Sequence, residues 1–102
     1  DFAPAFSSEG FKNYLAEKNS PKLESLITAV ESLNNTISSD ESLGDGFCIG
    51  HSYFCNLSAD AIHEQTLSGI VEYELIPLLK EYWFDEPLKV KDWSNNLRSA
   101  IK

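Results

Sequence analysis

The sequence of 102 residues has no methionine, two cysteines, four prolines and no apolar run near the ~18 residues that a membrane-spanning helix needs. It therefore predicts no membrane span and no membrane partner. The sequence has two cysteines and no secretory leader, which is not typical of a secreted fold cross-linked by disulfide bonds. We expect free thiols and a cytoplasmic location.

Basic residues are also few. Lys and Arg number 8 against 16 Asp and Glu, which gives a formal net charge of −8 at pH 7. Because an acidic surface repels the phosphates of DNA and RNA, we expect no direct nucleic acid binding by this domain. A simpler interpretation is that the charge only keeps the chain in solution.

Hydrophobic side chains, by contrast, make up 42% of the chain, which is enough for a compact core. The length suits one domain, so we expect residues 1–102 to form a single domain. The first residue is Asp1 rather than methionine, and we expect the chain to be an excerpt of a longer protein.

Start signals and periodicity predict two helices in the first half. Ser7 or Ser8 can cap a helix that continues to about Lys18. Ser20 followed by Pro21 is a typical helix start, because proline lacks an N–H that stays unbonded in a first turn. The apolar residues that follow are spaced by three and four: Leu23, Leu26, Ile27, Val30, Leu33 and Ile37. This spacing predicts a buried helix face.

The second half predicts a short helical turn over 58–65 and a long helix over 67–84. The apolar residues expected on the inner face of the long helix are Ile70, Val71, Leu75, Leu78, Leu79 and Tyr82. Pro77 lies inside this helix and removes one backbone hydrogen bond, the one to the carbonyl of Tyr73. We therefore expect a kink rather than an end.

A last helix is predicted to begin at Pro87, after a candidate cap at Asp85 or Glu86. Its inward stripe is Val90, Trp93, Leu97 and Ile101. No internal repeat and no alternation of strands with helices is evident. The predicted fold class is therefore all-α: a small bundle of about four helices, with a short strand or hairpin near Phe47–Ile49 as an option.

The chemically distinctive residues gather in one connection, Gly46–Leu57, between the two helical halves. Cys48, His51 and Cys55 lie in it, and His63 follows, which gives the pattern C-x2-H-x3-C-x7-H. Cysteine and histidine are zinc ligands, but this spacing matches no common zinc pattern. We expect no metal site, and interpret the cysteines as small buried apolar residues.

A catalytic nucleophile in the same connection is a further alternative. Cys48 with His51 lacks an evident orienting acid, and apolar surroundings raise the pKa of a thiol. Ser52 adjoins His51, but the G-x-S-x-G pattern is absent. We therefore assign no catalytic residue.

A different class of function is a helical protein-interaction module. Trp83, Phe84 and Trp93 would then form an exposed apolar patch that binds another chain. If both tryptophans are instead buried within one chain, these aromatic residues close the end of the bundle.

Two stretches of the sequence resemble a known family. LGDGFCIGHSYF, residues 43–54, and IVEYELIPLLKEYWFDEPLKV, residues 70–90, are similar to the C-terminal helical part of the McrB-like AAA+ proteins. The opening DFAPAF resembles the strand exit that follows the Arg-rich segment of that module. The likeness covers nearly all of the chain, from about Phe2 to Val90, and it depends on the order and spacing of the stretches together.

The resemblance implies that the chain is the helical lid subdomain of an NTPase that uses GTP or ATP with Mg²⁺. The implied partners are a large AAA+ subdomain of the same chain, further copies in a homo-oligomeric ring, and a nuclease subunit. NTP hydrolysis would power this nuclease in 5-methylcytosine-specific DNA restriction. The phosphate loop belongs to the large subdomain, and G-x-x-x-x-G-K-[ST] is absent here. We therefore expect no catalysis by this fragment alone.

Lids of AAA+ proteins often supply an arginine that senses the nucleotide, and here the sequence departs from that pattern. Its one arginine, Arg98, lies near the end of the last predicted helix. We take His51 and Ser52 as the candidate nucleotide-facing residues in its place. The apolar residues of the same connection are expected to plug the bundle: Phe47, Ile49 and Phe54.

Overall fold

The computed structural model describes residues 5–55, 57 and 64–102, and most of them are helical. The helices are α1 (Glu9–Lys18), α2 (Pro21–Ser39), α3 (Glu64–Ile70), α4 (Ile76–Tyr82) and α5 (Pro87–Ala100), with a π-helical segment, η5 (Val71–Leu75), between α3 and α4. Short 3-10 helices are η1 (Ala5–Ser7), η2 (Asp45–Phe47) and η3 (His51–Phe54). The predicted all-α fold class is confirmed.

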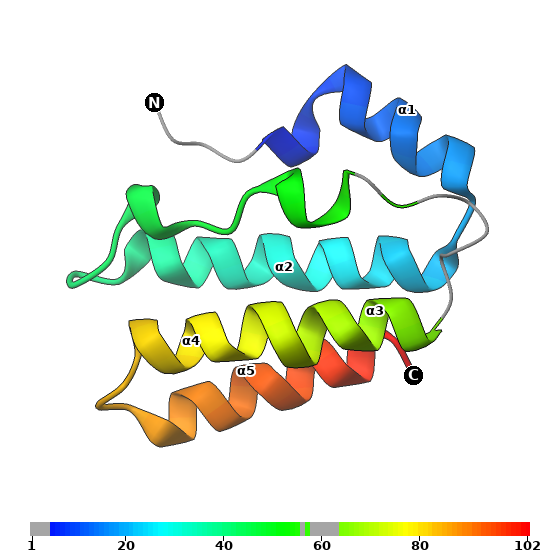
Figure 1. Ribbon diagram of the computed structural model, residues 1–102. Coiled ribbons are helices and arrows are strands. Elements are labelled where there is room, and N and C mark those ends of the chain that lie inside the picture. The colour runs from blue at the N-terminus through cyan, green and yellow to red at the C-terminus, as the bar shows by residue number, and fades with distance from the viewer. Residues whose placement is uncertain (1–4, 56, 58–63) are drawn as a thin grey trace.

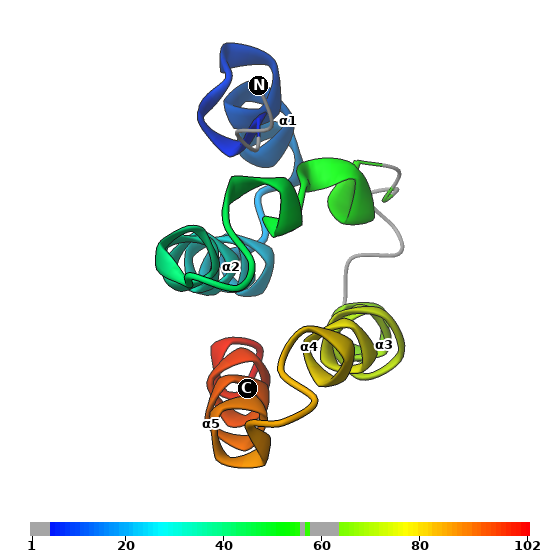
Figure 2. The ribbon, with the colours of Figure 1, turned by 90° about the vertical axis from the view of Figure 1, so that its left-hand side faces the viewer.

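The described elements stack in layers (Figure 1). α2 packs against α5, and α5 also packs against α4 and η5. Figure 2 shows α1 at one end of the stack and α5 at the other, with the segment that holds η2 and η3 next to α1. No described helix combines the length and the apolar character needed to cross a membrane.

α2 forms as its sequence predicts. Its N-cap is Ser20, whose hydroxyl accepts a hydrogen bond from the N–H of Leu23 at 3.2 Å, and Pro21 begins the helix. All six apolar residues predicted for the inner face are buried. The opposite face carries exposed polar residues: Glu24, Ser25, Glu31 and Ser32. α1 begins in the same way at Ser8, whose hydroxyl accepts from the N–H of Phe11 at 3.2 Å.

α3, η5 and α4 follow one another as one continuous helical rod (Figure 1). Pro77 stands in the first turn of α4, directly after the π segment, in which the N–H of Ile76 bonds to the carbonyl of Val71. The wider π turn shifts the hydrogen-bond register by one residue just before the proline, which has no N–H to donate. The prediction that the helix continues past Pro77 is confirmed, and the predicted kink stays a prediction.

The boundaries and burial of this rod differ in part from the prediction. It begins at Glu64 and ends at Tyr82, and most of the predicted 58–65 turn lies outside the described residues. Three of its predicted core residues are buried: Val71, Leu75 and Leu79. The other three are half-buried: Ile70, Leu78 and Tyr82.

α5 begins at Pro87, and Glu86 occupies the position before it, as expected. The Glu86 side chain, however, makes no capping hydrogen bond. Its carboxylate instead lies 3.4 Å from the ammonium of Lys89. Of the predicted stripe, Val90, Leu97 and Ile101 are buried and Trp93 is half-buried.

The optional strand near Phe47–Ile49 is wrong, since the described residues contain no strand. The N–H groups of Phe47 and Cys48 bond back to the carbonyls of Gly44 and Asp45, at 3.1 and 3.2 Å. These local bonds make a 3-10 turn. The next backbone N–H, that of Ile49, is taken by a side chain rather than by a neighbouring strand.

Candidate functional site

The candidate site is the connection Gly44–Leu57, of which the structure describes residues 44–55 and 57. The described part runs along α2 and passes next to α1 (Figure 1). It leaves α2 through a turn in which Gly44 has a positive φ of 89° and donates its N–H to the carbonyl of Ile37 at 3.2 Å. Few residues other than glycine adopt this backbone conformation. The turn therefore reverses the chain and sends it back along α2.

Asn34 fixes the middle of the connection. Its side-chain amide donates to the carbonyl of Ile49 at 2.8 Å, and its side-chain oxygen accepts from the N–H of Ile49 at 2.6 Å. Both residues are buried. One side chain thus satisfies both backbone groups of a buried residue, which would otherwise be costly to leave unpaired. Sequence reasoning missed Asn34, although its place on the buried stripe, four residues after Val30, is a signal.

Tyr14 of α1 fixes the end of the connection. Its hydroxyl donates to the carbonyl of Phe54 and accepts from the N–H of Leu57 at 3.1 Å. Its ring stacks against Phe11, with centroids 5.7 Å apart. This contact joins α1 to a segment about 40 positions later in the sequence. No sequence pattern indicates it.

His51 and Ser52, the two predicted site residues, begin η3 and differ in exposure. Ser52 is exposed, whereas His51 is half-buried. The imidazole lies edge-on to the rings of Phe11 and Phe6, at centroid distances of 5.5 and 6.4 Å. The ring therefore packs beneath η1 and α1 and does not project freely outward.

The three apolar residues of the connection that were predicted to fill the core differ in burial. Ile49 and Phe54 are buried, which confirms their predicted role. Phe47 is 43% exposed, so its predicted burial is wrong. Its ring lies edge-to-face on Tyr82 of α4, with centroids 5.3 Å apart. Because the η2 turn carries Phe47 past the end of the core, its ring covers Tyr82 at the surface.

The two cysteines are free and half-buried. The thiol of Cys48 is directed to the carbonyl of Asn34 at 3.5 Å, and that of Cys55 to the carbonyl of His51 at 3.2 Å. Burial, with a smaller effect of the Asp45 charge, raises the pKa of the Cys48 thiol. A raised pKa opposes formation of the thiolate that a nucleophile or a metal ligand requires.

Within the described ranges, no three His, Cys, Asp or Glu side chains come together as a metal site would require. The fourth member of the cysteine–histidine pattern, His63, lies outside the described residues. The prediction that all four side chains do not converge stays a prediction.

The proposed aromatic patch does not form as one surface. Trp83 is only 1% exposed and closes the end of the bundle. Its indole N–H donates to the carboxylate of Asp40 at 2.8 Å, and the ammonium of Lys89 lies 5.0 Å above its ring. Trp93 is half-buried, and Phe84 is 82% exposed.

Comparison with known proteins identifies the family. Residues 25–91 match the family model described as the McrB alpha-helical lid domain. The chain belongs to this family. It is also 41% identical over 102 residues to the type IV methyl-directed restriction enzyme EcoKMcrB subunit of Escherichia coli (strain K12). That similarity covers 95% of this chain and 22% of the relative, so the chain spans about a fifth of the relative's length.

The matched range places the McrB lid on the described structure. It begins in the first turns of α2, contains the whole candidate site and the rod from α3 to α4, and ends in the first turns of α5. Both stretches that carried the resemblance lie inside it. Helix α1 lies outside it, yet supplies the Tyr14 contact and the aromatic surface under His51.

Proposed function

We propose that this McrB lid belongs to an AAA+ NTPase that uses GTP or ATP with Mg²⁺ and powers a nuclease subunit in 5-methylcytosine-dependent DNA restriction. The observation that carries the proposal is the family match over residues 25–91. The name of the similar protein, a methyl-directed restriction enzyme subunit, supports the restriction role. The further partners in this proposal are a large AAA+ subdomain and other copies in a ring.

The geometry of the connection is suited to presenting a fixed surface to such a neighbour. Asn34 holds Ile49 just before η3, and Tyr14 holds Phe54 at its end. η3 is thereby fixed at both sides, with the hydroxyl of Ser52 exposed. Residues held by a rigid scaffold can meet a ligand without a large loss of entropy on binding. In this proposal Ser52 and the exposed edge of His51 face the nucleotide or the large subdomain.

The test is NTP hydrolysis by the complete protein that carries this lid. His51→Ala is expected to lower hydrolysis or nucleotide affinity by about tenfold, because a hydrogen bond to a charged group contributes about 1.5–3 kcal/mol. His51→Phe retains an aromatic ring against Phe6 and Phe11 and is expected to lose the same activity. Ser32→Ala, on the exposed face of α2, is the matched control and should leave the rate unchanged.

The isolated 102-residue chain is expected to hydrolyse neither GTP nor ATP above background. Turnover by this chain, retained after further purification, would contradict the assignment as a lid. Full activity of His51→Phe in the complete protein would instead remove His51 from the nucleotide site and leave the family assignment intact.

A further inference from the structure

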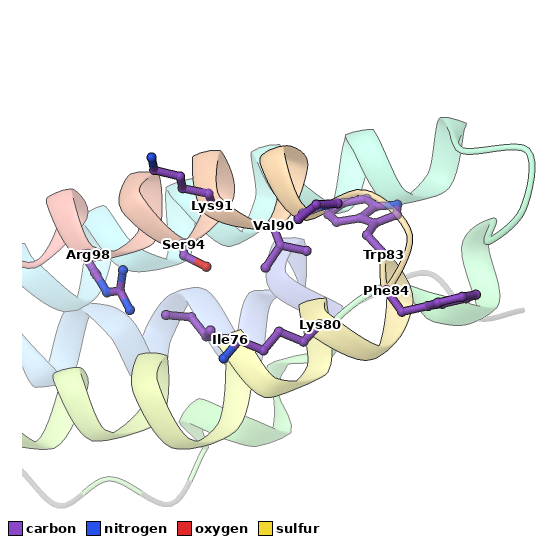
Figure 3. Close-up of a pocket in the computed structure, with 9 residues that line it drawn as sticks. Ile76, Lys80, Trp83, Phe84, Val90, Lys91, Ser94 and Arg98 are labelled. Carbon is purple, nitrogen blue, oxygen red and sulfur yellow. The ribbon is translucent and has the colours of Figure 1, made fainter.

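A groove of about 420 Å³ runs between α4 and α5 (Figure 3), and none of the residues that line it belongs to the candidate site. Sites that bind small molecules usually have volumes of ~300–1,000 Å³. Its apolar lining comes from Ile76 and Val90, with Trp83 and Phe84 at one end. The groove is therefore large enough for one or two apolar side chains of a partner.

The rim of the groove is basic in a chain that is otherwise acidic. Lys80, Lys91 and Arg98 line it, out of 8 basic residues in a chain of net charge −8. Arg98 is held by Glu72, with nitrogen–oxygen distances of 2.7 and 2.9 Å, so its charge is already offset. Lys80 and Lys91 form no ion pair with any described residue. Beside the groove, two cationic side chains thus remain unpaired among the described residues, Lys80 along α4 and Lys91 directed outward from α5 (Figure 3).

Ser94 supplies a polar group in the floor of the groove. The residue is only 4% exposed, and its hydroxyl points into the groove (Figure 3). It forms no hydrogen bond with any described residue. Among the described residues no buried side-chain nitrogen or oxygen lacks a hydrogen-bond partner, so the Ser94 hydroxyl is open to solvent through the groove. It can therefore exchange solvent for an incoming carbonyl or carboxylate.

Phe84 marks the open end of the groove. It is 82% exposed, beside the buried Trp83. A large exposed aromatic ring next to a basic, partly apolar groove is typical of a surface that binds another chain. The apolar lining of the groove disfavours a sugar-phosphate backbone and a bare inorganic anion, because neither offers apolar side chains to fill it.

We propose that this groove binds an acidic segment of a partner protein, in which one or two apolar residues are flanked by Asp or Glu. The apolar side chains pack on Val90 and Phe84, the carboxylates pair with Lys80 and Lys91, and the Ser94 hydroxyl donates to the segment. This interaction is independent of NTP hydrolysis and of the connection that holds His51.

The test uses the 102-residue chain labelled with ¹⁵N and two pools of eight-residue peptides. In the first pool, Leu, Ile, Phe or Trp occupies the two central positions and Asp or Glu fills the others. The second pool has Asn and Gln in place of Asp and Glu. The acidic pool is expected to shift the amide signals of Ser94 and Lys80 and the indole signal of Trp83, and the neutral pool to leave them in place.

Variants of the rim and floor sharpen the test. Lys80→Glu with Lys91→Glu is expected to weaken binding of the acidic pool by about tenfold or more. The matched control, Lys12→Glu with Lys102→Glu, makes the same change in net charge away from the groove and is expected to weaken binding less than twofold. Ser94→Ala is expected to weaken binding about threefold, since a neutral hydrogen bond contributes modestly, while the chain stays folded.

Three results would overturn the proposal. The first is that the acidic pool shifts no groove signals at about 2 mM peptide, where a weak protein contact is still detectable. The second is that the two pools bind equally well, or that the rim variant binds as well as its control, which would show that charge plays no part. The third is that phosphate or acetate alone reproduces the shifts, which would make the groove a simple anion site.

Discussion

Two regions of this lid are held together by different interactions. The bundle of α2, η5, α4 and α5 depends on apolar side chains that are fully buried along helix faces. The connection Gly44–Leu57 depends on two polar side chains, Asn34 and Tyr14, which bond to its backbone. In the bundle, many apolar residues each contribute part of the buried surface. In the connection, a single side chain makes the bonds at each anchored point. We therefore expect a change in the bundle to destabilise its helices together, and a change at an anchor of the connection to act locally.

The largest expected effect is a cavity in the bundle. Leu33 is fully buried in the middle of α2, at 0% exposure. Leu33→Ala is expected to lower the free energy of unfolding by about 2–5 kcal/mol, through lost burial and an unfilled cavity. Urea unfolding followed by circular dichroism measures it. Ser32→Ala, one residue earlier and exposed, is the control and is expected to change stability by less than about 0.5 kcal/mol.

Amide hydrogen exchange shows whether that loss is global. Leu33→Ala is expected to lower protection in α2, α4 and α5 together, since these helices share one core. Protection lost in α2 alone would mean that the helices of the bundle do not unfold as a unit.

The next effect separates the two regions. Asn34→Ala leaves the N–H and carbonyl of Ile49 buried without partners, so we expect a loss of about 2–3 kcal/mol. Exchange at Ile49 and through η3 is expected to speed up far more than exchange at Val30 or Leu79. Asn35→Ala, the exposed neighbour, is the control and should change neither.

Equal loss of protection at Ile49 and Leu79 in Asn34→Ala would contradict the distinction between the two regions. It would show that the connection and the bundle form one cooperative unit. The Asn34 bonds would then contribute to global stability in the same way as the buried Leu33.

The difference between the regions also explains what could be predicted from the sequence. Helix positions in α2 and α5 follow from capping residues, prolines and a spacing of three and four, all of which are local. The Asn34 bonds span 15 positions and the Tyr14 bond to Phe54 spans 40. No local pattern encodes such pairs. The connection was therefore recognised as chemically unusual, while the means by which it is held were missed.

The errors have the same origin. Phe47 was expected in the core because it is apolar, but the turn at Gly44 carries it to the surface of Tyr82. The alternative of one exposed patch made by Trp83, Phe84 and Trp93 fails at Trp83, whose ring is buried and whose indole bonds to Asp40. Both outcomes depend on partners distant in sequence. The candidate residues His51 and Ser52 were placed in one 3-10 helix, and their contact with a nucleotide stays a prediction.

Asp40 joins two elements of the bundle, because it ends α2 and also binds Trp83 at the far end of α4. Its carboxylate accepts hydrogen bonds from the hydroxyl and N–H of Ser42, at 2.7 and 2.8 Å, and from the indole of Trp83 at 2.8 Å. The Ser42 hydroxyl is the largest cause that lowers the pKa of Asp40 to about 2, and the Trp83 bond is the next.

Two other carboxylates also have a lowered pKa, so they too lose their stabilising contribution as the pH falls. The pKa of Glu64 is lowered by its hydrogen bond with Lys22, and that of Glu72 by its hydrogen bond with Arg98. Both pairs are solvent-exposed, and such pairs contribute little to stability. They are present in every variant of Asp40, so their shared contribution cancels in the comparison between variants.

The smallest expected effect is therefore a change in acid sensitivity in Asp40→Asn. A carboxylate whose pKa is lowered by folding stabilises the fold above its unfolded pKa, 3.8 here, and loses that contribution as the pH falls toward about 2. The free energy of unfolding of the unsubstituted chain should thus fall more steeply between about pH 4 and pH 2 than that of Asp40→Asn, by less than one proton in linkage. Urea unfolding at a series of pH values, followed by far-ultraviolet circular dichroism, measures both slopes. Asp85→Asn removes the same charge from an exposed position and should keep the original slope. Parallel curves for Asp40→Asn and the unsubstituted chain would show that Asp40 does not couple the end of α2 to Trp83 through its charge.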